Sequence, residues 1–416
     1  MTVTVTDAAG ETATTTVHVL EALEIAAGDL HTCARIAVST GGPGNSEEGV
    51  RCWGRNNVGQ IGDGQGTNEV WTPVPVTDNT GSPLTGVSQI AAGKDHNCAV
   101  TGSGKELWCW GANASFQLAA GSNYYSRAIL TKDLSGTSAV IESLTLGDKY
   151  TCYQKNDSGT RSTHCVGSHI SGELGDGTTA GGTSSTFSTV SQPGGFEFIA
   201  LGGGANHVCG VGFNGSSAYN VYCWGSDSDE QLGNGTPTGN QTSFQAASTG
   251  VFTQSGVVVG AGDKHTCAAG SGGSVTDLYC WGNNTPGQLG LTGGTKDTPT
   301  KLAAVTGASG WDKLAVGAMH TCATDDTKKE LYCWGEATDG QLGTGSTGDT
   351  NIPGQVLWDS SVGGGVVDYP TAISAGRYHT CFIESGNVFC FGCANSGIHY
   401  GQCSTSTNKP MFGVFY

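Results

Sequence analysis

The sequence contains little charge, little proline and no long apolar run. Charged residues make up 13% of its 416 residues, where about 25% is typical, and only 11 residues are proline. The proline count excludes a collagen and a proline-rich linker. Because no apolar stretch approaches about 20 residues, we expect no insertion into a membrane.

Basic residues are scarce as well. The chain has 18 Lys and Arg against 35 Asp and Glu, which gives a formal net charge of −17. Binding to DNA or RNA requires a basic face that neutralises phosphates, so we expect no nucleic-acid partner. The start of the chain, Met1-Thr-Val-Thr-Val-Thr, also lacks the basic and apolar regions of a signal peptide.

Glycine and cysteine are abundant instead. The 69 glycines are roughly twice the usual share and suit short strands joined by tight turns. The 16 cysteines form an even set, which is typical of a disulfide framework in an oxidising compartment. We therefore expect an extracellular or cell-surface protein whose export signal lies upstream of residue 1.

Three short motifs recur in fixed order along the chain. The first, Gly-x-x-His-Thr-Cys, has seven copies, and the third and fourth carry Tyr150 and Val208 in place of His and Thr. The second, Cys-Trp-Gly, follows each first motif, as Cys-Val-Gly at Cys165 and Cys-Phe-Gly at Cys390. The third is Gly-Gln-Leu-Gly, for example at residues 287–290. The first motif begins at Gly28, Gly93, Gly147, Gly204, Gly262, Gly317 and Gly376.

Each repeat predicts four short strands. In the second repeat these are Ser88–Ala92, Asn97–Val100 and Leu107–Trp110, while residues 72–76 supply a Pro-bounded fourth strand in the first repeat. No window shows sustained helical periodicity. Four strands repeated seven times predict an all-β, seven-bladed β-propeller, whereas a linear solenoid would need polar end caps that the sequence lacks.

The motifs also carry a family resemblance. Their order, and residues such as Gly28-Asp-Leu-His-Thr-Cys33, resemble the regulator-of-chromosome-condensation repeat over residues 21–416. The resemblance implies a seven-bladed propeller. Members of that family include a guanine-nucleotide exchange factor that docks on chromatin and secreted bacterial relatives, among them an inhibitor of β-lactamases. Paired cysteines and missing basic clusters depart from the eukaryotic members, so the resemblance transfers fold rather than function.

The cysteines of each repeat flank a β-hairpin. Facing positions on antiparallel strands lie close enough for a disulfide, and only Cys390-Phe-Gly-Cys393 offers a zinc-type spacing. We therefore expect one disulfide in each blade and no metal. The expected pairs are Cys33–Cys52, Cys98–Cys109, Cys152–Cys165, Cys209–Cys223, Cys267–Cys280, Cys322–Cys333, Cys381–Cys390 and Cys393–Cys403.

The recurring His and Trp residues allow two interpretations each. A ring of histidines suggests a metal site, but sevenfold-related positions lie too far apart to share an ion. We expect each His to bond backbone at the start of its hairpin. The Trp of Cys-Trp-Gly would stack sugars if it were exposed, and we expect it to fill the space between blades instead. No catalytic motif and no cofactor motif is present, so we expect no enzyme and no cofactor.

These observations predict an extracellular non-catalytic binding or structural module, such as an adhesin or a subunit of an extracellular assembly. Its partner would be an extracellular protein or glycan, or a second copy of the chain. Tyr124 and Tyr125, in a long inter-blade loop, are the candidate contact residues. An alternative is a secreted ligand or enzyme inhibitor that acts through one propeller face. Nucleotide exchange on a small GTPase is a further alternative, which the disulfides and the acidity both oppose, and a hydrolase is another.

The two ends of the chain allow one more prediction. Residues 1–20 predict a hairpin extension outside the propeller of residues 21–416, either as the remnant of an immunoglobulin-like domain or as a strand that complements a neighbouring molecule. Residues Met411–Tyr416 are expected to close the ring by pairing with strands near Leu23–Ala26.

Overall fold

The computed structural model describes residues 2–6, 12–16, 19–39, 49–66, 69–178, 181–192, 196–213, 219–236, 239–247, 257–270, 277–303, 305, 310–325, 327–357 and 365–392. Every regular element in these ranges is a β-strand. Within the same ranges, no helical segment is long and apolar enough to cross a membrane.

The described strands from β3 onward form seven antiparallel sheets in which neighbours along the chain are neighbours in space. Blade 1 contains β3 (Val19–Ala27), β4 (His31–Ser39), β5 (Gly49–Gly54) and β6 (Val70–Pro75). Blade 2 contains β7 (Gln89–Ala92), β8 (His96–Thr101), β9 (Glu106–Ala112) and β10 (Tyr124–Asp133). Blade 3 contains β11 (Val140–Leu146), β12 (Tyr150–Asp157), β13 (Thr160–Ser168) and β14 (Thr183–Thr189).

The later blades follow the same plan. Blade 4 contains β15 (Glu197–Gly203), β16 (His207–Phe213), β17 (Tyr219–Gly225) and β18 (Gln241–Ala246). Blade 5 contains β19 (Val257–Ala261), β20 (His265–Gly270), β21 (Leu278–Gly282) and β22 (Lys296–Lys301). Blade 6 contains β23 (Trp311–Val316), β24 (His320–Asp325), β25 (Leu331–Gly335) and β26 (Thr350–Gln355). Blade 7 has three described strands, β27 (Ala372–Ala375), β28 (His379–Glu384) and β29 (Asn387–Gly392).

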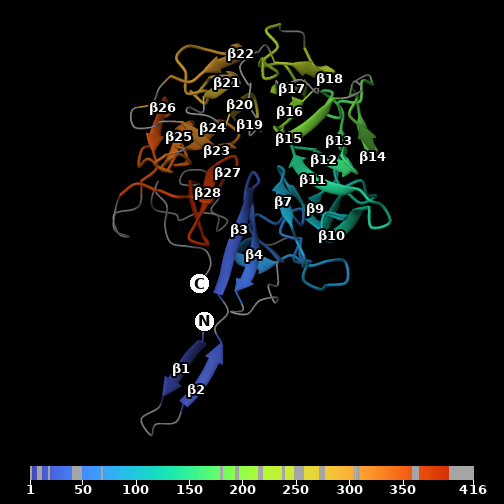
Figure 1. The fold of residues 1–416 in the computed structure, drawn as a ribbon, viewed down its shortest axis with the longest axis vertical. Coiled ribbons are helices and arrows are strands. Elements are labelled where there is room, and N and C mark those ends of the chain that lie inside the picture. Colours follow the sequence, from blue (N-terminus) through green and yellow to red (C-terminus); the bar gives the residue numbers. More distant parts are fainter. Residues whose placement is uncertain are drawn as a thin grey trace.

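The blades close into a ring (Figure 1). The first strand of each blade contacts the first strand of the next, and β27 of blade 7 contacts β3 of blade 1. Hydrogen bonds join these end blades; among them, the Ala22 amide donates to the Gly386 carbonyl at 2.8 Å, and the Ala27 amide donates to Ser374 Oγ at 2.9 Å. The prediction of a seven-bladed propeller is therefore confirmed.

Each blade carries one disulfide between its second and third strands. The cysteines face one another in the strand register, with Cα atoms 4.1 Å apart in every pair, as in Cys322–Cys333. The expected staple in each blade is confirmed as part of the fold. The eighth expected pair, Cys393–Cys403, lies outside the described residues.

The two chain ends are described only in part. β1 (Thr2–Thr6) and β2 (Thr12–Thr16) form a two-stranded antiparallel sheet that is separate from the seven blades. β3 begins at Val19, so this strand runs across the expected boundary at residue 20. The division into an extension and a propeller stays a prediction. The expected closing segment Met411–Tyr416 lies outside the described residues.

Candidate functional site

The recurring histidines lie at the seams between blades. Each one is fully buried, and its Nε2 atom lies within hydrogen-bond distance of a side-chain oxygen in the next blade. The series ends with His379 of blade 7, whose Nε2 lies 2.8 Å from Thr32 Oγ1 of blade 1. The pairs are His31–Asn97, His96–Thr151, His207–Thr266, His265–Thr321, His320–Thr380 and His379–Thr32.

The hydrogen-bond pattern fixes which ring nitrogen carries the proton. The Thr266 hydroxyl donates to the Gln231 carbonyl at 2.9 Å, so its oxygen accepts from His207 Nε2, also at 2.9 Å. The expected role of the recurring histidines is therefore only partly right. They are structural, but each one bonds a side chain of the neighbouring blade rather than backbone.

Burial keeps these imidazoles neutral. Desolvation lowers the pKa of His96, His207, His265 and His379 to about 3, and that of His320 to about 4. A neutral, enclosed imidazole whose Nε2–H is already bonded cannot reach a substrate in solvent, so we assign these side chains to blade cohesion.

The Trp and Gly motifs form a second contact at each seam. The five Trp residues of Cys-Trp-Gly are fully buried, which confirms the packing interpretation over exposed sugar stacking. Trp281 Nε1 donates to the Gln231 carbonyl of the preceding blade at 2.9 Å. Gly233, the last residue of that blade's third motif, has φ of 68°, and a Cβ there would collide with the Trp281 ring.

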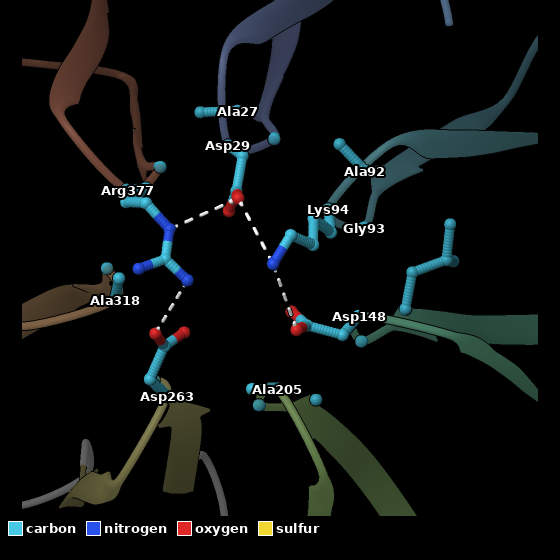
Figure 2. A pocket seen from close by; sticks show the side chains of 18 of the residues that line it. Ala27, Asp29, Ala92, Gly93, Lys94, Asp148, Ala205, Asp263, Ala318 and Arg377 are labelled. Atoms are coloured by element: carbon cyan, nitrogen blue, oxygen red, sulfur yellow. Dashed lines mark hydrogen bonds and ion pairs between the residues drawn. The ribbon is translucent and has the colours of Figure 1, made fainter. Parts of the chain in front are cut away.

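A narrow channel runs through the centre of the ring, and charged side chains fill one level of it (Figure 2). The residue that follows the first Gly of each first motif lines this channel. Six of these Gly residues pack against the carbonyl of the corresponding Gly in the next blade, and Gly376 packs against Gly28, so a Cβ at any of them would collide with backbone. The lining residues are Asp29, Lys94, Asp148, Ala205, Asp263, Ala318 and Arg377.

Ion pairs connect five of these side chains across the blades. Arg377 contacts Asp29 at 3.1 Å and Asp263 at 2.9 Å. Lys94 contacts Asp148 at 3.4 Å and Asp29 at 3.7 Å. Burial raises the pKa of Asp148 to about 6 against the opposing effect of Lys94, and it raises the pKa of Asp263 against that of Arg377.

The channel is too small for a ligand site. Its cavity is about 90 Å³, whereas pockets that bind small molecules usually measure about 300–1,000 Å³. The charged side chains therefore act as contacts between blades. Our sequence reasoning missed this group, although it occupies a variable position directly after an otherwise fixed Gly.

The expected contact residues Tyr124 and Tyr125 begin the outer strand β10. They line an open pocket of about 790 Å³ at the seam between blades 1 and 2, together with Asn79, Ser122 and Arg127. Tyr124 is 50% exposed, whereas Tyr125 is half-buried and packs on the core between blades 2 and 3. Their role in binding stays a prediction.

Within the described ranges, no group of three or more His, Cys, Asp or Glu side chains could hold a metal ion.

The repeats match a known family. The Regulator of chromosome condensation (RCC1) repeat matches residues 49–100, 277–324 and 330–383, and a second version of that repeat matches residues 87–117. Those segments contain the seam residues His96, Thr321 and Thr380 described above. The chain carries RCC1 repeats.

Two curated RCC1-repeat relatives show how far the similarity extends. The chain is 29% identical over 307 residues to the ultraviolet-B receptor UVR8 of Arabidopsis thaliana, which covers 73% of this chain and 64% of the receptor. It is 33% identical over 205 residues to the human probable E3 ubiquitin-protein ligase HERC4, which covers 48% of this chain and 18% of the ligase. The chain thus matches less than two thirds of either relative.

Solved structures share the RCC1 fold. Human WBSCR16 superposes with a TM-score of 0.69 at 18% identity, over 87% of this chain and 86% of that chain. Prp20p from Saccharomyces cerevisiae superposes with a TM-score of 0.68 at 18% identity, over 87% of this chain and 84% of that chain. At this identity the likeness concerns the fold alone.

Proposed function

We propose that the chain is an extracellular, non-catalytic binding module built on an RCC1-type propeller. The observation that carries the proposal is the disulfide in each blade. Disulfides form and persist in oxidising compartments and are rare in the cytosol, where thiols are kept reduced. Seven local staples make the scaffold suited to conditions outside the cell.

The use of the recurring polar side chains supports a non-catalytic role. The buried histidines are bonded within the seams, and the charged residues of the channel pair with one another. These recurring groups, which could otherwise act as acids or bases, are therefore committed to holding the blades together. Variation is left to the outer strands and loops, where Tyr124 and Tyr125 are the candidate contact residues.

The relatives support a protein-binding scaffold in general terms. The published structure of Prp20p reports binding to Gsp1p and histones, so a propeller of this fold serves as a surface for protein partners. The net charge of −17 argues against association of this chain with DNA or RNA.

The experiment is a fractionation of source cells into cytosol, envelope and medium, with thiol alkylation before lysis. We expect the full-length protein in the envelope or medium, with its cysteines protected from alkylation unless a reductant is added. A cytosolic protein with alkylated cysteines would refute the extracellular assignment. A surface or secreted protein that loses its binding partners after reduction would support it.

Self-assembly is a second candidate, because β1 and β2 pair only with each other in the described sheets. A two-stranded hairpin is marginally stable alone and has two edges with free backbone groups. Pairing of these edges with another copy would complete a larger sheet by β-augmentation. The chain would then be a subunit of an extracellular assembly.

A further inference from the structure

The outer strands reveal where one blade departs from the repeat. In each of blades 1–6, the fourth strand pairs with the Gly of Cys-Trp-Gly through one residue, which is Tyr125 in blade 2. An aromatic residue occupies this position in blade 2 alone among the six described outer strands. The equivalent residues are Val70, Tyr125, Ser184, Gln241, Lys296 and Thr350.

The positions on either side of Tyr125 are exceptional too. Two residues later, blade 2 has Arg127, where the other five blades have Thr72, Thr186, Ser243, Thr298 and Ile352. One residue earlier, blade 2 has Tyr124, where the others have Glu69, Thr183, Asn240, Thr295 and Asp349. Residues that the fold itself requires recur in every blade, so a cluster of three departures on one strand is free to serve another purpose.

Two glycines of blade 1 leave the space that the Arg127 side chain occupies. Gly64 and Gly81 both have positive φ, of 88° and 90°, and a Cβ on either would fall within collision distance of the guanidinium. Backbone bonds hold β10 against the same loops, since Gly64 N donates to Ser126 O at 2.7 Å and Ala128 N donates to Thr77 O at 2.8 Å. The position of the guanidinium is therefore built into the seam.

This guanidinium has no anionic partner among the residues that the structure describes. Arg127 is half-buried and lines the pocket, and no ion pair or hydrogen bond of its side chain occurs in those ranges. The two neighbouring carboxylates are occupied by local bonds. Asp78 Oδ1 accepts from Thr80 N, Thr80 Oγ1 and Ser82 N, and Asp63 Oδ1 accepts from Asn56 Nδ2 and Gln65 N. In a chain of net charge −17, an unpaired and positioned cation indicates an anionic ligand.

The aromatic side of the pocket is also held in place. The buried Asn113 donates from Nδ2 to the Ala120 and Ser122 carbonyls at 2.8 and 2.6 Å, which fixes the loop before β10. The Ser122 amide donates to Tyr125 Oη at 3.1 Å. Tyr125 is thus a positioning residue, whereas Tyr124 is 50% exposed and lines the same pocket as Arg127. A pre-organised loop reduces the entropy lost when a ligand binds.

We propose that this pocket binds an acidic saccharide, with Arg127 pairing with a carboxylate or sulfate on the sugar and Tyr124 stacking on the sugar ring. Apart from the tyrosines, Arg127 and Ile129, the side chains that line the pocket carry hydroxyl or amide groups, from Ser122, Ser126, Asn79 and Asn123. These groups can exchange hydrogen bonds with sugar hydroxyls, while the aromatic ring of Tyr124 offers an apolar face to the sugar ring. The proposal rests on the proposed function, because it assigns a ligand class to the same contact residues.

The test is calorimetric titration of the full chain with four probes at low salt: a tetrasaccharide of hexuronic acids, a sulfated tetrasaccharide, a neutral tetrasaccharide and an Asp-rich peptide of matched charge. We expect one or both acidic saccharides to bind, and the neutral saccharide and the peptide to bind at least tenfold more weakly. The two acidic probes distinguish a carboxylate from a sulfate ligand. Loss of a charge-assisted bond in Arg127→Gln should weaken binding by about tenfold or more, and Tyr124→Ala should also weaken it.

Lys132→Gln is the matched control, because it removes one positive charge from the same strand outside the pocket. It should bind like the unaltered chain, and all variants should keep the thermal unfolding midpoint. Four results would overturn the proposal: no saccharide binding, equal binding of the neutral probe, stronger binding of the peptide, or unchanged affinity in Arg127→Gln. None of these results bears on where the protein is located, so failure here is distinguishable from failure of the extracellular assignment.

Discussion

Two departures from the repeat, Tyr150 and Val208, explain each other at the scale of single residues. Val208 stands where other blades have a Thr or Asn that accepts from the preceding His, and a valine side chain cannot accept. The preceding blade carries Tyr150 instead of His. Its hydroxyl reaches the Gly204 and His207 carbonyls of blade 4, at 2.8 and 2.6 Å. One polar seam contact is thus replaced by another that needs no side-chain acceptor.

This coupling predicts the outcome of a double-mutant cycle. Tyr150→His should lower the free energy of unfolding by about 2–4 kcal/mol, because it leaves a cavity and a buried N–H that faces Val208. Adding Val208→Thr should recover about 1–2 kcal/mol by supplying the acceptor. Urea unfolding of the two single variants and the double variant measures the coupling.

The single variant Val208→Thr serves as the control. It should destabilise the chain, since its hydroxyl would face Tyr150 rather than an imidazole. Strictly additive effects of the two substitutions would contradict the exchange of one seam contact for another.

The hairpin with its disulfide is the stabilising unit at the scale of elements. Sequence separations of the bonded cysteines run from 9 residues in Cys381–Cys390 to 19 in Cys33–Cys52. In the chain-entropy model, the stabilisation expected for loops of these two lengths differs by only about 0.7 kcal/mol. The seven disulfides should therefore contribute similar amounts to the free energy of unfolding.

Removing one staple should therefore cost about 3 kcal/mol in any blade. The variant Cys322→Ala/Cys333→Ala tests this in blade 6, and the equivalent pair of substitutions at Cys267 and Cys280 tests it in blade 5. Chemical denaturation under oxidising conditions gives the free energies of unfolding. Under full reduction the differences from the unaltered chain should shrink, and an effect that persists unchanged would assign the loss to packing instead.

The seams between blades make stability depend on pH. The seam histidines have a pKa of about 3 to 4 in the folded chain, against about 6.5 when unfolded, so the unfolded state binds protons more readily. Their contribution is complete above pH 6.5 and is lost as the pH falls from there toward 3. Lowering the pH from 7 to 5 should reduce the free energy of unfolding by about 2 kcal/mol for each of these histidines. The raised pKa values of Asp148, about 6, of Glu384, about 7, and of Asp263 act in the opposite direction.

We expect the urea midpoint to fall steadily from pH 7 to pH 4. His265→Gln should reduce the slope, because a Gln amide can donate to Thr321 and does not titrate. Equal midpoints at pH 7 and 5 would contradict neutral, buried histidines.

At the scale of the whole molecule, the described part of the ring closes through contacts that the seven repeats share. His379 bonds Thr32 just as each earlier His bonds the next blade, and Arg377 reaches Asp29 across the same seam. The first strand of blade 1 is thereby fixed to blade 7. The hairpin β1–β2 adds nothing to these closing contacts, which leaves it free for another role.

Deleting residues 1–16 tests that role and spares β3, which begins at Val19. We expect the full chain to self-associate with rising concentration and the shortened chain to remain monomeric, with the same thermal midpoint. Light scattering measures the mass of both. Equal masses would refute the complementing strand and favour a remnant of a neighbouring domain.

The sequence by itself determined the architecture and the staples. The motif spacing gave seven repeats, and the cysteine positions gave hairpin pairs, because both follow from local strand and turn geometry that each repeat contains in full. The burial of the Trp residues could be inferred for the same reason, since Val166 and Phe391 replace them without a polar group.

Only the tertiary structure decided what crosses the seams. The partner of each His lies in the next blade, 55 to 66 residues along the chain in the first five pairs and 347 residues back for His379, and no local pattern identifies it. The channel charges were missed because residues such as Asp29 and Arg377 meet only once the ring closes. The space occupied by the Arg127 side chain likewise depends on two glycines of the preceding blade. The position of the guanidinium therefore follows from the packing of blades rather than from the repeat itself.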